Sequence, residues 1–147
     1  MNPNLQLSQD ITNIVHDSFI SWEMHEKVSP VTRELLHFWF DENWTINRNI
    51  NFHEGQKQAI LNTIYLTEIL KVSSVKDMYN KVSPDLILEK SVWLNYIGSD
   101  RFDYRRFCYK MATGTGKTWV VLALLVWQYL NYTYQKENEI WESEVKF

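Results

Sequence analysis

The chain has 147 residues, of which 45% are hydrophobic and 15% aromatic, and its formal net charge at pH 7 is −3. This apolar composition excludes an intrinsically disordered chain, and the acidic balance excludes a generally basic nucleic-acid coat. With a single cysteine, Cys108, and no leader pattern at the N-terminus, we expect a cytoplasmic protein without an internal disulfide. The longest apolar run, residues 119–127, is shorter than the roughly 20 residues that span a bilayer, so no membrane anchor is expected.

Two amphipathic helices are predicted in the first forty residues. Residues 8–27 carry apolar side chains at a period near 3.6, and Ser8 is a candidate N-cap. Pro30 interrupts this pattern. Residues 32–40 then form the second helix, with Thr32 as its candidate cap.

Two further helices are predicted in the middle of the chain. Residues 51–71 are apolar on more than one side, so we expect their helix to be packed between other elements. The next helix begins at Pro84, with Ser83 as its cap, and stops at Gly98.

The last third of the chain changes character. Residues 105–111, RRFCYKM, form a short aromatic and aliphatic run that favours a strand, in which Cys108 is expected to be a small buried residue and not a nucleophile. After the glycines, residues 119–135 predict a helix that is buried on most faces. The predicted order is therefore strand, glycine loop, buried helix.

The glycine loop is MATGTGKT, residues 111–118, which holds two of the four glycines of the chain. The phosphate-binding P-loop pattern ends in Gly-Lys-Ser/Thr, which Gly116, Lys117 and Thr118 match. Met111 stands where the first glycine of the pattern usually lies. The strict pattern is therefore missed by one residue.

The chemistry of this loop nonetheless fits a phosphate chain. Gly114 and Gly116 allow successive backbone N–H groups to converge on an anion, and the following helix adds its positive N-terminal end. Lys117 is expected to reach the β- and γ-phosphates, and Thr118 to hold Mg²⁺. A structural glycine turn is the alternative.

Three segments together resemble a known family. MATGTGKT resembles motif I of superfamily 2 helicases and translocases, in which a hydrophobic residue often replaces the first glycine, as Met111 does. FHEGQKQAI, residues 52–60, resembles the glutamine-bearing motif of the same superfamily. With TRELLHFWF, residues 32–40, these segments resemble the amino-terminal part of the Res subunit of type III restriction enzymes and related DEAD/DEAH-box proteins, over most of residues 31–131.

The resemblance implies an α/β fold. Residues 51–147 would be an incomplete RecA-like P-loop domain, with its first strand, the P-loop and the following helix, after a mainly helical extension at residues 1–50. The sequence has no DEAD or DEAH string, which in this family orients Mg²⁺ and water. We therefore expect a truncated piece that stops before the Walker B strand.

The resemblance also implies a site for ATP and Mg²⁺. Lys117 and Thr118 are the implied catalytic residues, with Thr118 as the metal ligand. Gln56 matches the glutamine that reads N6 and N7 of adenine, and Phe52 would stack on the ring. An ordinary first-turn helix residue is the alternative interpretation of Gln56. The implied cofactor-binding set is Gly114, Thr115, Gly116, Lys117, Thr118, Gln56 and Phe52.

The implied activity of the parent protein is ATP-driven helicase or translocase action on DNA, coupled to restriction. Its implied partners are DNA and a modification methyltransferase subunit. A noncatalytic truncated remnant, acting only through nucleotide or subunit binding, is the first alternative. The second is a small self-contained P-loop kinase, but the acidic base and lid arginines that it needs are not found after Thr118.

Two other groups of residues were candidates for binding. Residues 101–110 interleave basic and aromatic side chains, which fits either a single-strand-binding surface or a solvated strand edge, and we favour the second. The four histidines, His16, His25, His37 and His53, lack the spacing of metal ligands, so no metal site is expected beyond nucleotide-bound Mg²⁺.

Overall fold

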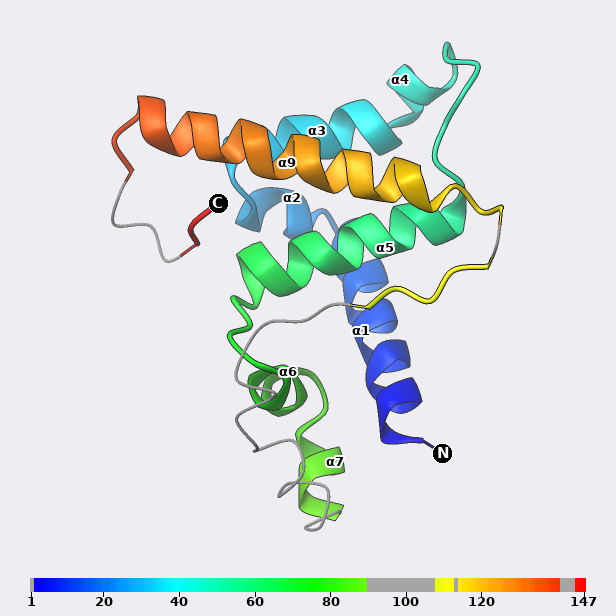
Figure 1. The fold of residues 1–147 in the computed structure, drawn as a ribbon, viewed down its shortest axis with the longest axis vertical. Helices are drawn as coiled ribbons and strands as arrows, with labels where there is room; N and C mark the ends of the chain where they lie inside the picture. Colours follow the sequence, from blue (N-terminus) through cyan, green and yellow to red (C-terminus); the bar gives the residue numbers. More distant parts are fainter. Residues whose placement is uncertain (1, 90–107, 113, 141–144) are drawn as a thin grey trace.

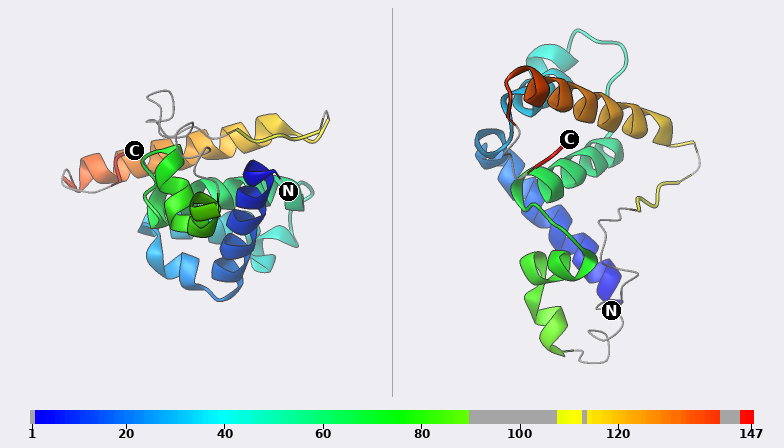
Figure 2. Two further views of the ribbon diagram at one scale, coloured as in Figure 1. Left: turned by 90° about the horizontal axis from the view of Figure 1, so that it is seen from below. Right: turned by 60° about the vertical axis from the view of Figure 1, so that its left-hand side comes forward.

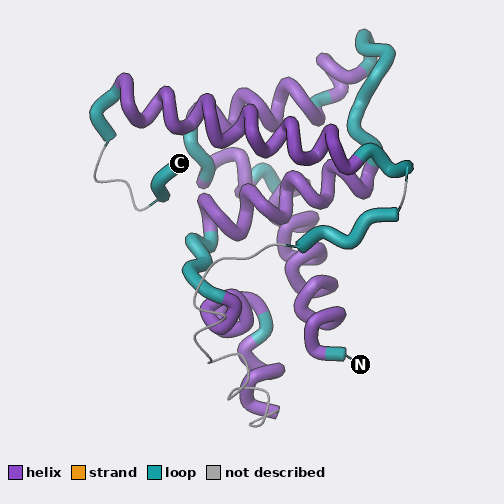
Figure 3. The backbone as a smooth tube through the Cα atoms, viewed as in Figure 1, coloured by secondary structure: helices purple, strands orange, loops and turns teal. Residues whose placement is uncertain are grey.

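The structure is a computed structural model that describes residues 2–89, 108–112, 114–140 and 145–147. Its elements in chain order are α1 (Pro3–Ile20), α2 (Glu23–Lys27), α3 (Pro30–Phe40), α4 (Glu42–Thr45), α5 (Glu54–Ile64), the π-helix η1 (Tyr65–Ile69), α6 (Val75–Val82), α7 (Pro84–Glu89) and α9 (Lys117–Glu137). All regular secondary structure of the described residues is thus helical (Figure 3).

The prediction of an α/β, RecA-like fold with a first strand is wrong. Residues 108–111, the described part of the predicted strand, have no regular secondary structure, and residues 105–107 lie outside the described part of the chain. A strand requires a hydrogen-bonded neighbour, and no described segment supplies one. Tyr109 instead fastens this segment to α5 through a hydrogen bond with the hydroxyl of Thr63. Cys108 is exposed, contrary to the prediction that it is buried.

Helix α5 lies at the centre of the fold. It contacts α1 on one side and α9 on another, and α9 also contacts α3 (Figure 1). Ile60 and Ile64 are fully buried, and Ala59 and Leu61 nearly so, which confirms that this helix is packed between other elements. Helices α6 and α7 lie at the end of the molecule remote from α9 (Figure 1).

Helix starts follow local capping chemistry. α1 begins at Pro3, earlier than the predicted cap at Ser8, because Asn2 accepts a hydrogen bond from a first-turn N–H group. Trp22, in the left-handed region with φ of 65°, separates α1 from α2, so the single predicted helix over residues 8–27 is divided. Ser29, and not the predicted Thr32, is the N-cap of α3. The hydroxyl oxygen of Ser29 accepts the backbone N–H of Thr32 at 3.0 Å.

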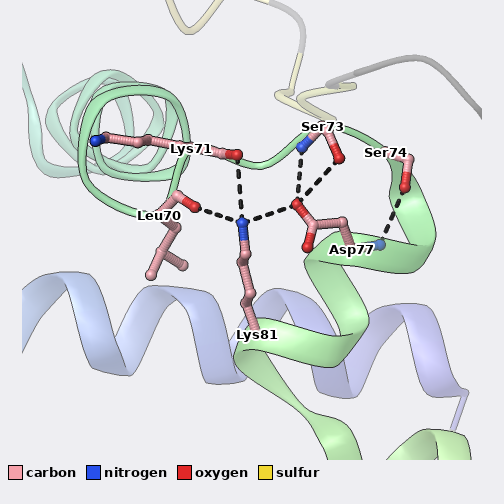
Figure 4. A network of polar contacts seen from close by, with 6 residues as sticks. All are labelled: Leu70, Lys71, Ser73, Ser74, Asp77 and Lys81. Atoms are coloured by element: carbon pink, nitrogen blue, oxygen red, sulfur yellow. Dashed lines mark hydrogen bonds and ion pairs between the residues drawn. The ribbon is translucent and has the colours of Figure 1, made fainter. Parts of the chain in front are cut away.

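The turn between η1 and α6 is closed by a lysine (Figure 4). The Nζ atom of Lys81 donates to the carbonyl of Leu70 at 2.8 Å and forms an ion pair with Asp77 at 2.9 Å. The Asp77 carboxylate also accepts the N–H of Ser73 at 2.9 Å. The positive charge of Lys81 thereby covers backbone carbonyls at the end of η1 and fixes the direction in which α6 leaves.

A buried polar network joins α9 to α3 and η1. Glu68, only 7% exposed, accepts hydrogen bonds from the indole Nε1 of Trp127 at 2.8 Å and from the backbone N–H of Ser29 at 2.8 Å. The hydroxyl of Thr32 also donates to Glu68, and the amide of Asn131 donates to Thr32 at 3.0 Å. These partners satisfy a carboxylate that would be costly to bury alone. They therefore fasten the middle of α9 to the rest of the molecule.

Candidate functional site

The glycine loop ends in a tight turn that leads into α9. Gly114 and Gly116 have φ values of +80° and +68°, a region that residues with a side chain seldom adopt. The backbone N–H and the hydroxyl of Thr115 both donate to the carbonyl of Ala112, at 3.4 and 2.7 Å. Gly116 is then the N-cap of α9, without a side-chain cap. Both glycines of the loop are therefore required by backbone conformation.

The first turn of α5 holds this loop in place. The Nε2 atom of Gln56 donates to the carbonyls of Thr115 and Gly116, at 3.1 Å each. The Nε2 atom of His53 lies 2.9 Å from the same Thr115 carbonyl. Because a carbonyl can only accept, this geometry places the imidazole proton on Nε2. His53 and Gln56 also form the capping box of α5, so one motif both starts this helix and anchors the loop.

These contacts decide which way the loop peptides face. In a trans peptide unit the C=O and N–H bonds point in opposite directions, and no cis peptide occurs among the described residues. The carbonyls of Thr115 and Gly116 point at α5, so the N–H groups of Gly116 and Lys117 in the same two units point away from it. The loop thus presents donors on the side that α5 leaves open.

The side chains that follow the loop face solvent. Lys117 and Thr118 are both exposed at the first turn of α9. Within the described part of the chain, no ion pair involves Lys117. The positive end of the helix, two outward N–H groups and a free ammonium group are therefore gathered in one place, which is an arrangement suited to an anion.

A pocket of about 430 Å³ opens beside the loop. It is lined by Phe38, Trp39, Arg48, Ile50, Asn51, Phe52, His53, Gln56, Gly114, Thr115, Gly116 and Trp119. Its walls combine aromatic rings with a few hydrogen-bonding groups, as is common in sites for planar organic ligands. Arg48 contributes a buried Nε atom that has no hydrogen-bond partner among the described residues.

The structure brings the predicted site residues together in this region. Phe52 is half-buried and lies edge-on to Trp39, with a distance of 6.0 Å between ring centroids. Gln56 is only 5% exposed, and both hydrogens of its amide are directed at loop carbonyls. Its Oε1 atom accepts the N–H of His53 at 3.0 Å. The first-turn position of Gln56 was anticipated, but not its burial against the loop.

The roles of two residues of this site, His53 and Trp119, were not predicted from the sequence. The sequence argument did not identify His53 as a helix cap, although its position at the start of a helix, three residues before a glutamine, is the signal of a capping box. Trp119 lines the pocket from the first turn of α9 and is 53% exposed. The sequence placed it in a helix thought to be buried on most faces.

The remaining candidates from the sequence are a basic cluster and a possible metal site. Arg101, Arg105 and Arg106 of the basic cluster lie outside the described residues. Within the described ranges, no group of three or more His, Cys, Asp or Glu side chains could hold a metal ion. None of the helices in the described part of the chain is long and apolar enough to cross a membrane.

Comparison with known proteins gives one finding. Residues 49–140 match the family model described as type III restriction enzyme, res subunit. This match covers the loop, α5 and α9. No curated protein and no solved structure matches the chain.

Proposed function

The chain belongs to the family of type III restriction enzyme res subunits, and from this premise we propose that it binds ATP, with Mg²⁺, at the loop formed by residues 111–118. The observation that carries the proposal is the orientation of the loop peptides. Hydrogen bonds from Gln56 hold the Thr115 and Gly116 carbonyls inward, so the neighbouring N–H groups are available to phosphate oxygens.

Each residue of the site then has a distinct role. The backbone from Gly114 through Thr115 to Gly116 cradles the phosphates, and Lys117 neutralises their charge. Thr118, one residue further along the first turn, offers its hydroxyl to Mg²⁺. Bound Mg²⁺ would neutralise part of the phosphate charge.

The pocket beside the loop is the proposed place of the adenine base. Phe52, in the loop before α5, and Trp119, in the first turn of α9, supply apolar ring surface from two different segments of the chain. Gln56 would read adenine by redirecting its amide from a loop carbonyl toward the base. Such a change would couple recognition of the base to the position of the phosphate loop, because one side chain serves both.

The wider role follows the family. Its members are related to ATP-dependent helicases, and we propose that the parent activity is translocation on DNA together with a modification methyltransferase subunit. The family match begins at residue 49, which supports a division between an extension at residues 1–50 and a nucleotide-binding part at residues 51–147. Because the chain has no DEAD or DEAH string, we expect it to bind ATP without hydrolysing it at a measurable rate.

Titration calorimetry with MgATP tests the proposal. The wild-type chain should bind ATP and also inorganic pyrophosphate, and Lys117→Ala should weaken both by about 10- to 100-fold through loss of a charge-assisted hydrogen bond. Lys136→Ala is the matched control, because it removes the same charge from the last turn of the same helix. Equal losses in the two variants, or no binding by the wild type, would disprove a specific site at the loop.

A further inference from the structure

His25 lies in a cluster of rings where α2 meets α1 and α3. Helix α2 contacts α1, η1 and α3, and it lies at the edge of the molecule, away from the glycine loop (Figure 2, right). His25 is only 6% exposed. Its ring centroid lies 5.0 Å from that of Phe19, 4.4 Å from that of Trp22 and 5.3 Å from that of His37. These four residues form what we call the aromatic corner.

The imidazole of His25 has no buried partner for a second N–H group. Its Nδ1 atom is buried without a hydrogen-bond partner among the described residues. A neutral imidazole carries one N–H group, whereas the imidazolium ion carries one on each nitrogen. Protonated His25 would therefore bury both a charge and an unpaired donor, and each of these is costly in an apolar site.

The nearest charged groups add to this cost. The Nε atom of Arg33 donates to the backbone carbonyl of His25 at 2.6 Å, which brings a permanent positive charge close to the corner. The carboxylate of Asp41, at the C-cap of α3, lies 3.5 Å from Nδ1 of His37. Burial, and then the positive charges of His37 and Arg33, lower the pKa of His25 below its ordinary value of 6.5, against the opposing effect of Asp41.

The other titratable groups of the surrounding elements leave this balance unchanged. They are His16 and Asp17 on α1, Glu23, Glu26 and Lys27 on α2, Glu34 on α3, Glu42 on α4, Tyr65 and Glu68 on η1, and Lys57 on α5. Lys27 pairs with Glu23, and Glu68 is held by the polar network around α9. The ammonium group of Lys57 lies 4.7 Å from the ring centroid of Phe19, so it adds a further positive charge beside the corner.

We propose that the aromatic corner is a pH-sensitive element, which is closed while His25 is neutral and opens when His25 takes up a proton in mildly acidic solution. Helix α2 suits this role because it has only five residues, of which Met24 and His25 are buried. Trp22, its N-cap, has a φ of 65°, which a residue with a side chain adopts at a cost. Opening would relieve this strain and give the imidazolium ion water as its hydrogen-bond partner.

NMR on the wild-type chain is the first test. In a titration from about pH 8 to about pH 5, the Cε1–H signal of His25 should show half-protonation below pH 6.5. The N–H of Val28, which donates to the carbonyl of Met24 at 3.2 Å, reports on α2. Its protection from hydrogen exchange, corrected for the intrinsic rate, should fall by up to about tenfold for each pH unit below 6.5, while α5 stays protected. Half-protonation at or above pH 6.5, or equal loss of protection in α2 and α5, would overturn the proposal.

Replacing His25 by phenylalanine assigns the effect to this ring. His25→Phe keeps an aromatic ring in the corner and removes the proton site, so the protection of α2 should no longer depend on pH. His16→Phe is the matched control, because it makes the same substitution at an exposed position of α1. It should keep the pH dependence of the wild type. A pH-dependent loss that persists in His25→Phe, or that disappears in His16→Phe, would contradict the assignment. The wild-type measurement does not depend on how well either variant folds.

Discussion

Replacing Gly116 by alanine tests the contact between the glycine loop and α5. A Cβ atom at this position would lie 2.4 Å from the Nε2 atom of Gln56. The amide must therefore move, and its hydrogen bonds to the carbonyls of Thr115 and Gly116 are lost. Two such bonds contribute about 1 to 3 kcal/mol together, and the φ of +68° adds a strain of about 1 to 2 kcal/mol for a residue with a side chain.

The second glycine of the loop provides the matched control. Gly114 has a φ of +80°, but a Cβ atom there would meet nothing within 4 Å. Gly114→Ala therefore introduces strain alone, and the smaller entropy of alanine in the unfolded chain, about 0.5 kcal/mol, is common to both variants. The free energy of unfolding should fall by about 1 to 3 kcal/mol more in Gly116→Ala than in Gly114→Ala, which is the share of the two hydrogen bonds.

Urea unfolding followed by circular dichroism measures this difference. Gln56→Ala removes the clashing amide and leaves Trp119 Cδ1, 3.3 Å from the added Cβ atom, as its close neighbour, so in that background the extra cost of Gly116→Ala over Gly114→Ala should largely disappear. ATP affinity should follow the same order, because the loop loses its anchor only when the amide is displaced. Equal destabilisation by the two glycine variants, or an unchanged cost of Gly116→Ala in the Gln56→Ala background, would refute the assignment of the loop anchor.

Three further predictions concern single side chains. Gln56→Ala should weaken binding of ATP more than of GTP in calorimetric titrations, because only adenine offers the edge that an amide matches; equal losses would leave Gln56 with a loop-positioning role alone. Trp127→Phe removes an indole donor from buried Glu68 and should lower the free energy of unfolding, measured in urea, by about 1.5 to 3 kcal/mol. Trp119→Phe, at a 53% exposed position, should change this free energy little. Similar costs in the two variants would contradict the proposed network around Glu68. Burial raises the pKa of Tyr109 from 10.0 to about 12. Between pH 10 and pH 12 the unfolded chain has therefore lost a proton that the folded chain keeps, so the free energy of unfolding should fall as the pH rises. The same fall in Tyr109→Phe would exclude Tyr109 as its cause.

Much of the helical structure and the unusual backbone of the glycine loop could be predicted from the sequence. Apolar periodicity indicated α1, α3 and α5, because the apolar residues on the buried face of a helix recur every three or four positions. The loop was evident from Gly114, Gly116 and Lys117, because glycine at such density signals unusual backbone conformation. These features depend on local chemistry, which a sequence displays directly.

The errors arose where distant contacts decide the structure. Residues 105–111 have strand propensity, but a segment forms a strand only when it pairs with a neighbouring strand. Tyr109 instead forms a hydrogen bond with Thr63 of α5. The hydrophobicity of α9 suggested burial on most faces, yet only one face meets α3 and α5. The role of Gln56 as an anchor depends on a contact with residues about 60 positions away, which no local pattern reveals.

The fastening of α9 by Trp127 and Asn131 has a mechanical consequence. Trp127, which donates directly to Glu68, lies ten residues from each end of the helix, or about 15 Å at 1.5 Å per residue. If α9 tilts as a rigid rod about Trp127, its two ends are lever arms of equal length. A displacement of Lys117 at the glycine loop is then matched by an opposite displacement of similar size at Glu137, so a tilt of α9 couples the two ends of the helix.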